Sequence, residues 1–152
     1  KNDASKAVSI GDLMRKNNLT EIVETHRATP NAERQKYTTM AHGAQFVEVR
    51  VDEDLGIIKV ARVVEATAVG RIMNPKTSHS QEMGGVVWGI GMALQEHTEI
   101  DHRYGRMMTT DLASYHVPVN ADVHEVVTDF VAEEDKIVNP LGVKGMGELC
   151  MV

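Results

Sequence analysis

Cysteine is nearly absent from this sequence, with one residue, Cys150, in a chain of 152. A single thiol forms no disulfide within the chain, and by itself it holds neither an iron–sulfur cluster nor a structural zinc ion. Any redox centre bound here must therefore be held mainly by other groups, or be supplied by another chain.

The sequence also lacks an excess of positive charge and a long apolar run. Its 16 Lys and Arg against 22 Asp and Glu give a net charge of -6, and no basic cluster stands out. Phosphate binding needs a basic face, so this balance argues against a nucleic-acid partner. The longest apolar stretch, residues 83–94, is too short and too rich in glycine to span a bilayer. We expect neither a nucleic-acid partner nor a membrane span.

Several familiar catalytic and metal-binding motifs are missing as well. The seven histidines show no His-Glu-x-x-His spacing and there is no Cys-x-x-Cys pair, which disfavours a histidine metal site. No Gly-x-Ser-x-Gly elbow is present for a serine hydrolase. The glycines at 142, 145 and 147 lack the strand–turn–helix context of a dinucleotide fingerprint, and no Walker motif follows them.

What is present is an alternation of helical and strand patterns. A capping box at Ser9 and Asp12 starts a short helix. Turn residues and hydrophobic periodicity predict the remaining elements: a strand at 19–28, a polar loop at 29–40, a hairpin of 45–51 and 57–69, a helix from 75 to about 95, a short hairpin at 99–108 and a strand at 126–131. The predicted fold class is α+β, with antiparallel strands packed on one long, buried, glycine-containing helix.

The predicted long helix combines an apolar stripe with four internal glycines. Each glycine costs about 1 kcal/mol relative to alanine in a helix. Such a cost indicates that a neighbouring backbone or a ligand approaches the helix closely. The apolar stripe, at i, i+3, i+4, i+7 and i+11, consists of Met83, Val86, Val87, Ile90 and Leu94. The four glycines are Gly84, Gly85, Gly89 and Gly91.

Two loops have features of a binding site, although each could also be a purely structural turn. Residues 70–77 form either a plain strand-to-helix connection or an anion site, because Arg71 and Lys76 flank a helix N-terminus with free N–H groups. Residues 142–148 form either a tight turn or a loop that brings N–H groups to an anionic ligand while aiming Glu148 at a fixed point.

Five motifs stand in a fixed order along the chain, at residues 41–49 (AHGAQFVEV), 70–76 (GRIMNPK), 81–91 (QEMGGVVWGIG), 115–122 (YHVPVNAD) and 139–148 (NPLGVKGMGE). Together they resemble a known family, the molybdenum-binding subunits of the xanthine dehydrogenase and aldehyde oxidase enzymes. The resemblance covers roughly residues 40–152 and is strongest to the bacterial periplasmic aldehyde oxidoreductases. In domain terms, residues 1–39 are then a helix-strand lead-in and loop. Residues 40–152 are the C-terminal molybdopterin-binding region, which ends just after Glu148.

The resemblance implies a role for each matching residue. Glu148 corresponds to the general base that takes a proton from a molybdenum-bound hydroxyl, and Gln81 to an amide that hydrogen-bonds the pterin. The segment that contacts the cytosine dinucleotide form of the cofactor corresponds to Arg71, Ile72, Met73, Asn74, Pro75, Lys76 and Thr77. The loop whose backbone cradles the pterin corresponds to Lys144, Gly145, Met146 and Gly147.

The resemblance also implies a reaction and partners. We expect a fragment that hydroxylates aldehydes or N-heterocycles, with electrons passing to iron–sulfur clusters and FAD on other chains or domains, and with the remainder of the molybdenum subunit as a partner. Both chain ends read as cuts through a larger protein, so the fragment alone is expected to be inactive. Its location is periplasmic if the likeness to the periplasmic enzymes holds, and otherwise cytoplasmic. The alternatives are a xanthine or purine dehydrogenase subunit, and a structural or binding module that keeps the fold without cofactor.

Overall fold

The computed structural model describes residues 7–29 and 32–151, in two compact units, Lys1–Pro30 and Asn31–Val152. The first unit contains the short helix α1 (Ile10–Lys16). The hydroxyl of Ser9 accepts a hydrogen bond of 3.1 Å from the backbone N–H of Asp12 and donates one of 2.7 Å to its carboxylate. The predicted helix start at Ser9 is therefore confirmed, with the Asp12 carboxylate bonded to the Ser9 hydroxyl where a full capping box would bond the Ser9 N–H.

The predicted strand at 19–28 is wrong. In the structure this segment is neither helix nor strand, and its side chains are exposed. An extended segment becomes a strand only where a neighbouring strand offers its backbone groups, and the described residues 7–29 contain none. The predicted polar loop at 29–40 includes a 3₁₀ helix, η2 (Ala32–Lys36). Residues 30 and 31 of that loop and residues 1–6 of the predicted lead-in lie outside the description.

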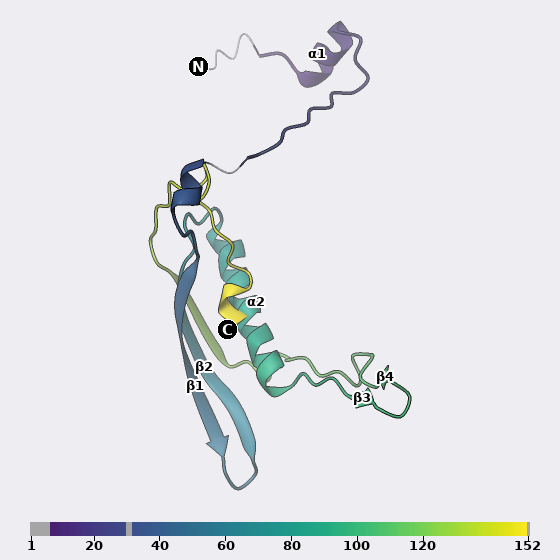
Figure 1. The fold of residues 1–152 in the computed structure, drawn as a ribbon, viewed down its shortest axis with the longest axis vertical. Helices are drawn as coiled ribbons and strands as arrows, with labels where there is room; N and C mark the ends of the chain where they lie inside the picture. Colours follow the sequence, from purple (N-terminus) through teal and green to yellow (C-terminus); the bar gives the residue numbers. More distant parts are fainter. Residues whose placement is uncertain (1–6, 30–31, 152) are drawn as a thin grey trace. The chain divides into compact units, whose positions relative to one another are not determined.

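The second unit is built on a long hairpin, as predicted (Figure 1). Strands β1 (His42–Asp52) and β2 (Ile57–Ala68) pair antiparallel. The turn between them ends at Gly56, whose φ of 66° suits glycine.

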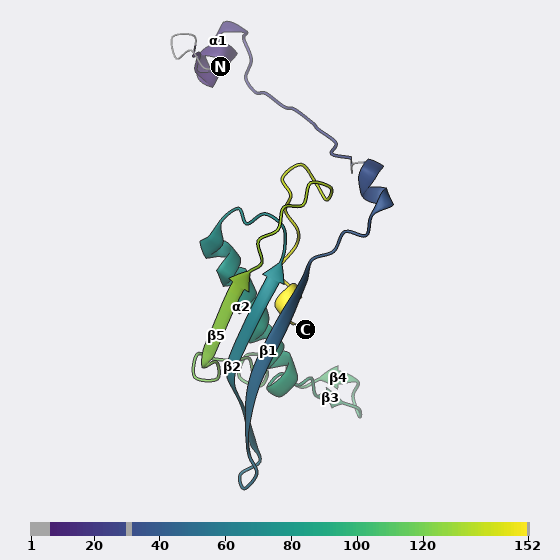
Figure 2. The same ribbon diagram turned by 90° about the vertical axis from the view of Figure 1, so that its left-hand side faces the viewer.

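A third strand, β5 (Glu125–Phe130), lies beside β2, which gives the sheet order β1-β2-β5. The predicted strand is confirmed, but β5 runs parallel to β2, so the expectation of purely antiparallel strands is wrong. The cause is the helix between the two strands, because a helical crossover returns the chain to the end of the sheet where β2 began. Figure 2 shows this helix lying behind the three strands.

That helix, α2 (Pro75–Leu94), begins and ends close to the predicted positions. Asn74 caps it by accepting a hydrogen bond of 3.3 Å from the N–H of Thr77. Only one face is buried, however, and of the predicted stripe Val86 and Ile90 are buried while the side chains of Met83 and Leu94 are exposed. The predicted long, buried helix is therefore buried along one face only. Its buried residues are Ser78, Glu82, Gly85, Val86, Ile90 and Gly91.

The core between the sheet and α2 is small, and the buried hydrophobic cluster consists of Val60, Val63, Val86, Ile90 and Cys150. The short hairpin predicted at 99–108 is confirmed as β3 (Ile100–Asp101) and β4 (Arg106–Met107), and the chain closes with the 3₁₀ helix η3 (Leu149–Met151). Among the helices of the described residues, none combines the length and hydropathy needed to cross a bilayer.

Candidate functional site

The two loops singled out from the sequence lie against each other. The bridge between Gly70 and Val143 joins the connection after β2 to the last loop. On either side of it, the N–H of Arg71 donates to the carbonyl of Gly142 over 2.7 Å, and the N–H of Lys144 donates to the carbonyl of Val69 over 3.0 Å. The fold therefore brings two segments more than sixty residues apart into one surface.

This contact depends on glycine at position 70. Gly70 has a φ of 74°, and a Cβ there would collide with the carbonyl of Gly142. A side chain at position 70 would therefore separate the two loops.

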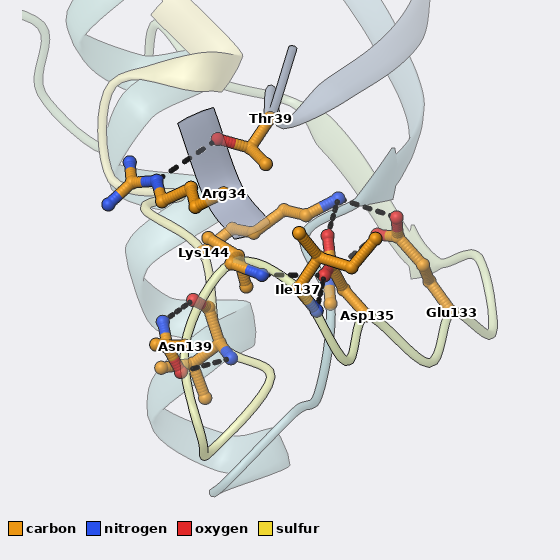
Figure 3. A network of polar contacts seen from close by, with 10 residues as sticks. Arg34, Thr39, Glu133, Asp135, Ile137, Asn139 and Lys144 are labelled. Carbon is orange, nitrogen blue, oxygen red and sulfur yellow. Dashed lines mark hydrogen bonds and ion pairs between the residues drawn. The ribbon is translucent and has the colours of Figure 1, made fainter. Parts of the chain in front are cut away.

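Lys144 is held by two acids rather than offered to solvent (Figure 3). Its Nζ lies 2.5 Å from Glu133 Oε1 and 3.2 Å from Asp135 Oδ2, with 7% of the side chain exposed. The hydrogen bond from Lys144 lowers the pKa of Glu133, and in return Glu133 raises the pKa of the ammonium group. The other Glu133 oxygen accepts from the N–H of Gly70 over 2.8 Å. The ammonium charge is thus neutralised internally, so this loop offers a ligand its backbone rather than its lysine.

Asn139 fixes the shape of the same loop. Its Oδ1 accepts from the N–H groups of Leu141 and Val143 at 3.0 and 3.3 Å, and its Nδ2 donates to the Val143 carbonyl over 2.7 Å. Figure 3 shows hydrogen bonds at the labelled Asn139. One side chain therefore closes the turn that precedes residues 144–148.

Gln81 and Gly147 meet where the last loop passes α2. The Oε1 atom of Gln81 lies 3.0 Å from the position that a Cβ on Gly147 would occupy. Glu148, the next residue, is exposed, as is Gln81. The predicted amide and the predicted base are therefore carried by adjacent pieces of backbone.

Close approach, the predicted explanation, is found at three of the four α2 glycines. A Cβ on Gly85 would lie 3.1 Å from Cys150 Cβ, and one on Gly89 would lie 2.8 Å from the Met151 carbonyl oxygen. Gly91 would meet side chains, Glu96 Oε1 at 2.5 Å and Pro118 Cδ at 2.7 Å, whereas Gly84 faces open space. Two of the four glycines thus let the segment after Gly147 pack directly on the helix.

The predicted dinucleotide segment is mostly solvent-facing. Of residues 71–77, only Ile72 is partly covered. In the described part of the chain, neither Arg71 nor Lys76 forms an ion pair. Arg71 also lines a polar cleft of about 410 Å³ whose other wall is the loop from Glu133 to Gly142.

The sequence prediction missed two acids in the core, Glu65 on β2 and Glu82 on α2, with 1% and 0% exposure. Burial raises the pKa of both carboxyl groups, and it raises the pKa of the nearby Cys150 thiol. A signal for Glu82 existed, because it lies four and eight residues before Val86 and Ile90 and so shares their face. For Glu65 the signal was a charge inside a β-branched run.

Comparison with known proteins identifies the family. Residues 2–124 match the model of the molybdopterin cofactor-binding domain. The chain belongs to this family. The match ends before the loop at 139–148, so the site residues there depend on the contacts described above.

The relatives of this chain include molybdenum-binding subunits of an aldehyde oxidoreductase and of a putative xanthine dehydrogenase. The chain is 39% identical over 115 residues to the aldehyde oxidoreductase molybdenum-binding subunit PaoC of Escherichia coli, covering 76% of this chain and 16% of that protein. It is 32% identical to a putative xanthine dehydrogenase molybdenum-binding subunit of the same species, covering 71% of this chain and 14% of that one. The chain therefore spans about one sixth of the first of these relatives.

Solved structures share the fold of this domain. Quinoline 2-oxidoreductase from Pseudomonas putida superposes with a TM-score of 0.68 at 30% identity, over 73% of this chain and 14% of that one. Aldehyde oxidoreductase from Desulfovibrio gigas gives 0.62 at 25% identity, over 73% and 12%. The family predicted from the sequence motifs is thereby confirmed, and the mixed sheet with one covering helix is part of these larger chains.

Proposed function

We propose that this chain is the part of a molybdenum hydroxylase that carries its catalytic base, Glu148, and one side of its cofactor site. The observation that carries the proposal is the contact of Gln81 with Gly147. It presents an amide from α2 and a carboxylate from the last loop on adjacent, exposed backbone. This pairing is what an anionic pterin with a reacting centre at its edge requires, namely a hydrogen-bonding group beside a proton acceptor.

The residues present fit such a cofactor. A Cβ on Gly145 would meet nothing within 4 Å, which leaves space above the loop backbone, and the ammonium of Lys144 is already paired. We assign the cradle to the backbone of residues 144–147 and the pterin amide contact to Gln81. We assign Arg71, which forms no ion pair with any described residue, to the anionic phosphates of a cytosine dinucleotide, with Lys76 beside it.

Glu148 acts in this scheme as a general base. When bound, the molybdenum cofactor supplies the two-electron oxidation of the substrate carbon, with water as the source of oxygen. Glu148 accepts on a carboxylate oxygen the proton that is released as this oxygen is delivered. Its backbone lies directly before η3 and follows a loop fixed by Asn139 and by the Gly70 bridge, which positions the residue relative to α2.

An aldehyde is the proposed substrate, because an aldehyde oxidoreductase is the relative with 39% identity. An N-heterocycle is the second candidate, supported by a nicotine 6-hydroxylase large subunit from Paenarthrobacter nicotinovorans at 35% identity. In either case the rest of the molybdenum subunit completes the pocket. Iron–sulfur and FAD partners take the electrons.

Glu148→Gln in the whole subunit tests this role. The variant should keep its molybdenum and its pterin, since the amide preserves shape, and lose a factor of about 10²–10⁴ in kcat because no proton acceptor remains. Metal analysis, release of the cofactor and turnover of an aromatic aldehyde measure the two effects. Glu53→Gln, an exposed acid in the β1–β2 turn, is the control and should match the wild type.

Near-normal turnover in the Glu148→Gln variant would remove Glu148 from this role. A complex purified without molybdenum and without releasable pterin would instead favour a module that keeps the fold without cofactor.

A further inference from the structure

Three metal-ligand side chains from three different elements meet in the core. Glu65 comes from β2, Glu82 from α2 and Cys150 from η3, and one ligand atom from each lies within 4.8 Å of the others. Their exposures are 1%, 0% and 2%. Because these residues are far apart in the sequence and lack a metal-binding spacing, only the fold brings them together.

Each carboxylate has one oxygen anchored and one oxygen free. Glu65 Oε2 accepts from Gln45 Nε2 over 2.9 Å, and Glu82 Oε1 accepts from the hydroxyl of Thr67. Glu65 Oε1 and Glu82 Oε2 are fully buried and accept no hydrogen bond from the described residues. Metal-binding carboxylates commonly have this arrangement, in which one oxygen accepts a hydrogen bond that orients the side chain and the other oxygen binds the ion.

The charge around this cluster is uncompensated. Among the described side chains, no lysine or arginine pairs with Glu65 or Glu82. Outside the cluster, two titratable groups affect the pKa of Glu82: His79 lowers it and Asp129 raises it. His79 Nδ1 also lies 2.6 Å from the hydroxyl of Thr128. Two buried carboxylates without a cation are costly, so the cluster must take up either protons or a positive ion.

We propose that Glu65, Glu82 and Cys150 bind a divalent cation, with zinc as the favoured ion. A thiolate with two carboxylates suits zinc among the common divalent ions. Zinc bonds of about 2.0–2.3 Å hold ligands within roughly 4 Å of one another, so small side-chain rotations close the site. Three protein ligands leave a fourth position for water. The ion would tie β2 and α2 to η3, two residues beyond Glu148, and this structural role is independent of the proposed catalysis.

Metal content and cobalt spectroscopy of the full chain test the site. The chain is refolded with Zn²⁺ or with Co²⁺, freed of excess metal, and analysed. We expect one ion per chain, a thiolate-to-cobalt charge-transfer absorption, and a lower Tm after chelation. Cys150→Ser should abolish the absorption, and Glu82→Gln should weaken Zn²⁺ binding at least tenfold. Glu125→Gln, an exposed acid paired with Arg62, is the control and should bind as the wild type does.

If Glu65 and Glu82 hold protons instead of a metal ion, the experiment gives the opposite results. If the chain refolds without metal, binds no Zn²⁺ above the level of the Glu82→Gln, Cys150→Ser double variant, and keeps its Tm in chelator, the proposal is overturned. Cobalt binding without the charge-transfer absorption also overturns it, because the thiolate is then no ligand. Should Glu82→Gln fail to fold by circular dichroism, the Cys150→Ser spectrum alone decides, since that change is nearly isosteric.

Discussion

At the scale of single residues, the chain contains two kinds of buried acid, those paired with a cation and those without one. Lys144 is enclosed by Glu133 and Asp135, so each charge has a partner at 2.5 or 3.2 Å. Glu65 and Glu82 are more deeply buried and have only neutral donors. The first arrangement stabilises the ionised forms and the second destabilises them, which gives the two groups of acids opposite dependence on pH.

The lysine network should make the protein sensitive to acid. The folded-state pKa of Glu133 is lowered, chiefly by Lys144, and that of Asp135 is lowered, chiefly by the N–H groups of Val138 and Ile137. Carboxyl groups with lowered pKa contribute stability that is present above their ordinary values of 4.5 and 3.8 and is lost as pH falls below them. Urea unfolding between pH 3 and 7 should show this loss.

Lys144→Met isolates the contribution of the ammonium group. The variant should unfold roughly 5–10 °C below the wild type at pH 7, because two acids lose their cation, and its stability should decline less steeply below pH 4.5. Lys136→Met serves as the control, since Lys136 belongs to an exposed pair with Glu134 and should shift Tm little. Equal Tm values for the two variants would show that the network is not structural.

At the scale of elements, two glycines of α2 show opposite surroundings. Gly89 lies against the Met151 carbonyl, while Gly84 faces open space in this chain. Of the two, only the first holds η3 against the helix. The second carries the helix-propensity cost without a contact that requires it.

Alanine at each position should separate these roles. Gly84→Ala should raise the free energy of unfolding by up to about 1 kcal/mol, the helix propensity difference. Gly89→Ala should lower it by about 1–3 kcal/mol, since a Cβ 2.8 Å from a backbone oxygen forces η3 away. Denaturant melts of both variants measure this. Two changes of the same sign would contradict the packing described for α2.

The elements that the sequence predicted well are those whose local signals agree with their packing. Asn74 and Pro75 placed the start of α2, and the alternating residues with Gly56 placed the hairpin. The strand at 19–28 failed because a strand depends on a partner that no local pattern shows. The direction of β5 failed for the same reason, since it follows from the crossover and not from residues 125–130.

The site was predicted less completely than the fold. Motif resemblance singled out Gln81 and Glu148, and the structure places Gln81 beside Gly147. Glu65, Glu82 and the pairing of Lys144 with Glu133 were missed, because charged side chains are mostly exposed and were assigned to solvent, even though the periodicity puts Glu82 on the buried face of the helix. Burial of a charge is decided by tertiary contacts that periodicity does not contain.

At the scale of the whole molecule, the chain exposes much apolar surface. On one face of β1, the side chains of Val47, Val49 and Val51 are 52%, 49% and 60% exposed, and Phe46 on the opposite face is 74% exposed. An apolar groove of about 340 Å³ runs between this hairpin and α2, beside Cys150. Contiguous apolar surface of this kind marks protein contacts, in keeping with a chain that spans about 16% of its relative PaoC.

The chain studied alone should therefore self-associate. Sedimentation velocity over a tenfold range of concentration should show species larger than a monomer, and Phe46→Lys should shift the distribution toward monomer because it places a charge on the exposed strand. Leu112→Lys changes a side chain that is 81% exposed but lies outside the sheet, and it should have a smaller effect. A wild-type chain that remains monomeric throughout would contradict the assignment of β1 as a contact surface.

The bridge between Gly70 and Val143 also sets an order of assembly. These residues are 73 positions apart in the sequence. Closing a loop of that length lowers the entropy of the chain before the contact can stabilise the fold. Strand β2, helix α2 and strand β5 all lie before Val143 and can form first. The segment that carries Glu148 can therefore dock after these elements have formed, and until it docks the surface of α2 that receives η3 stays uncovered.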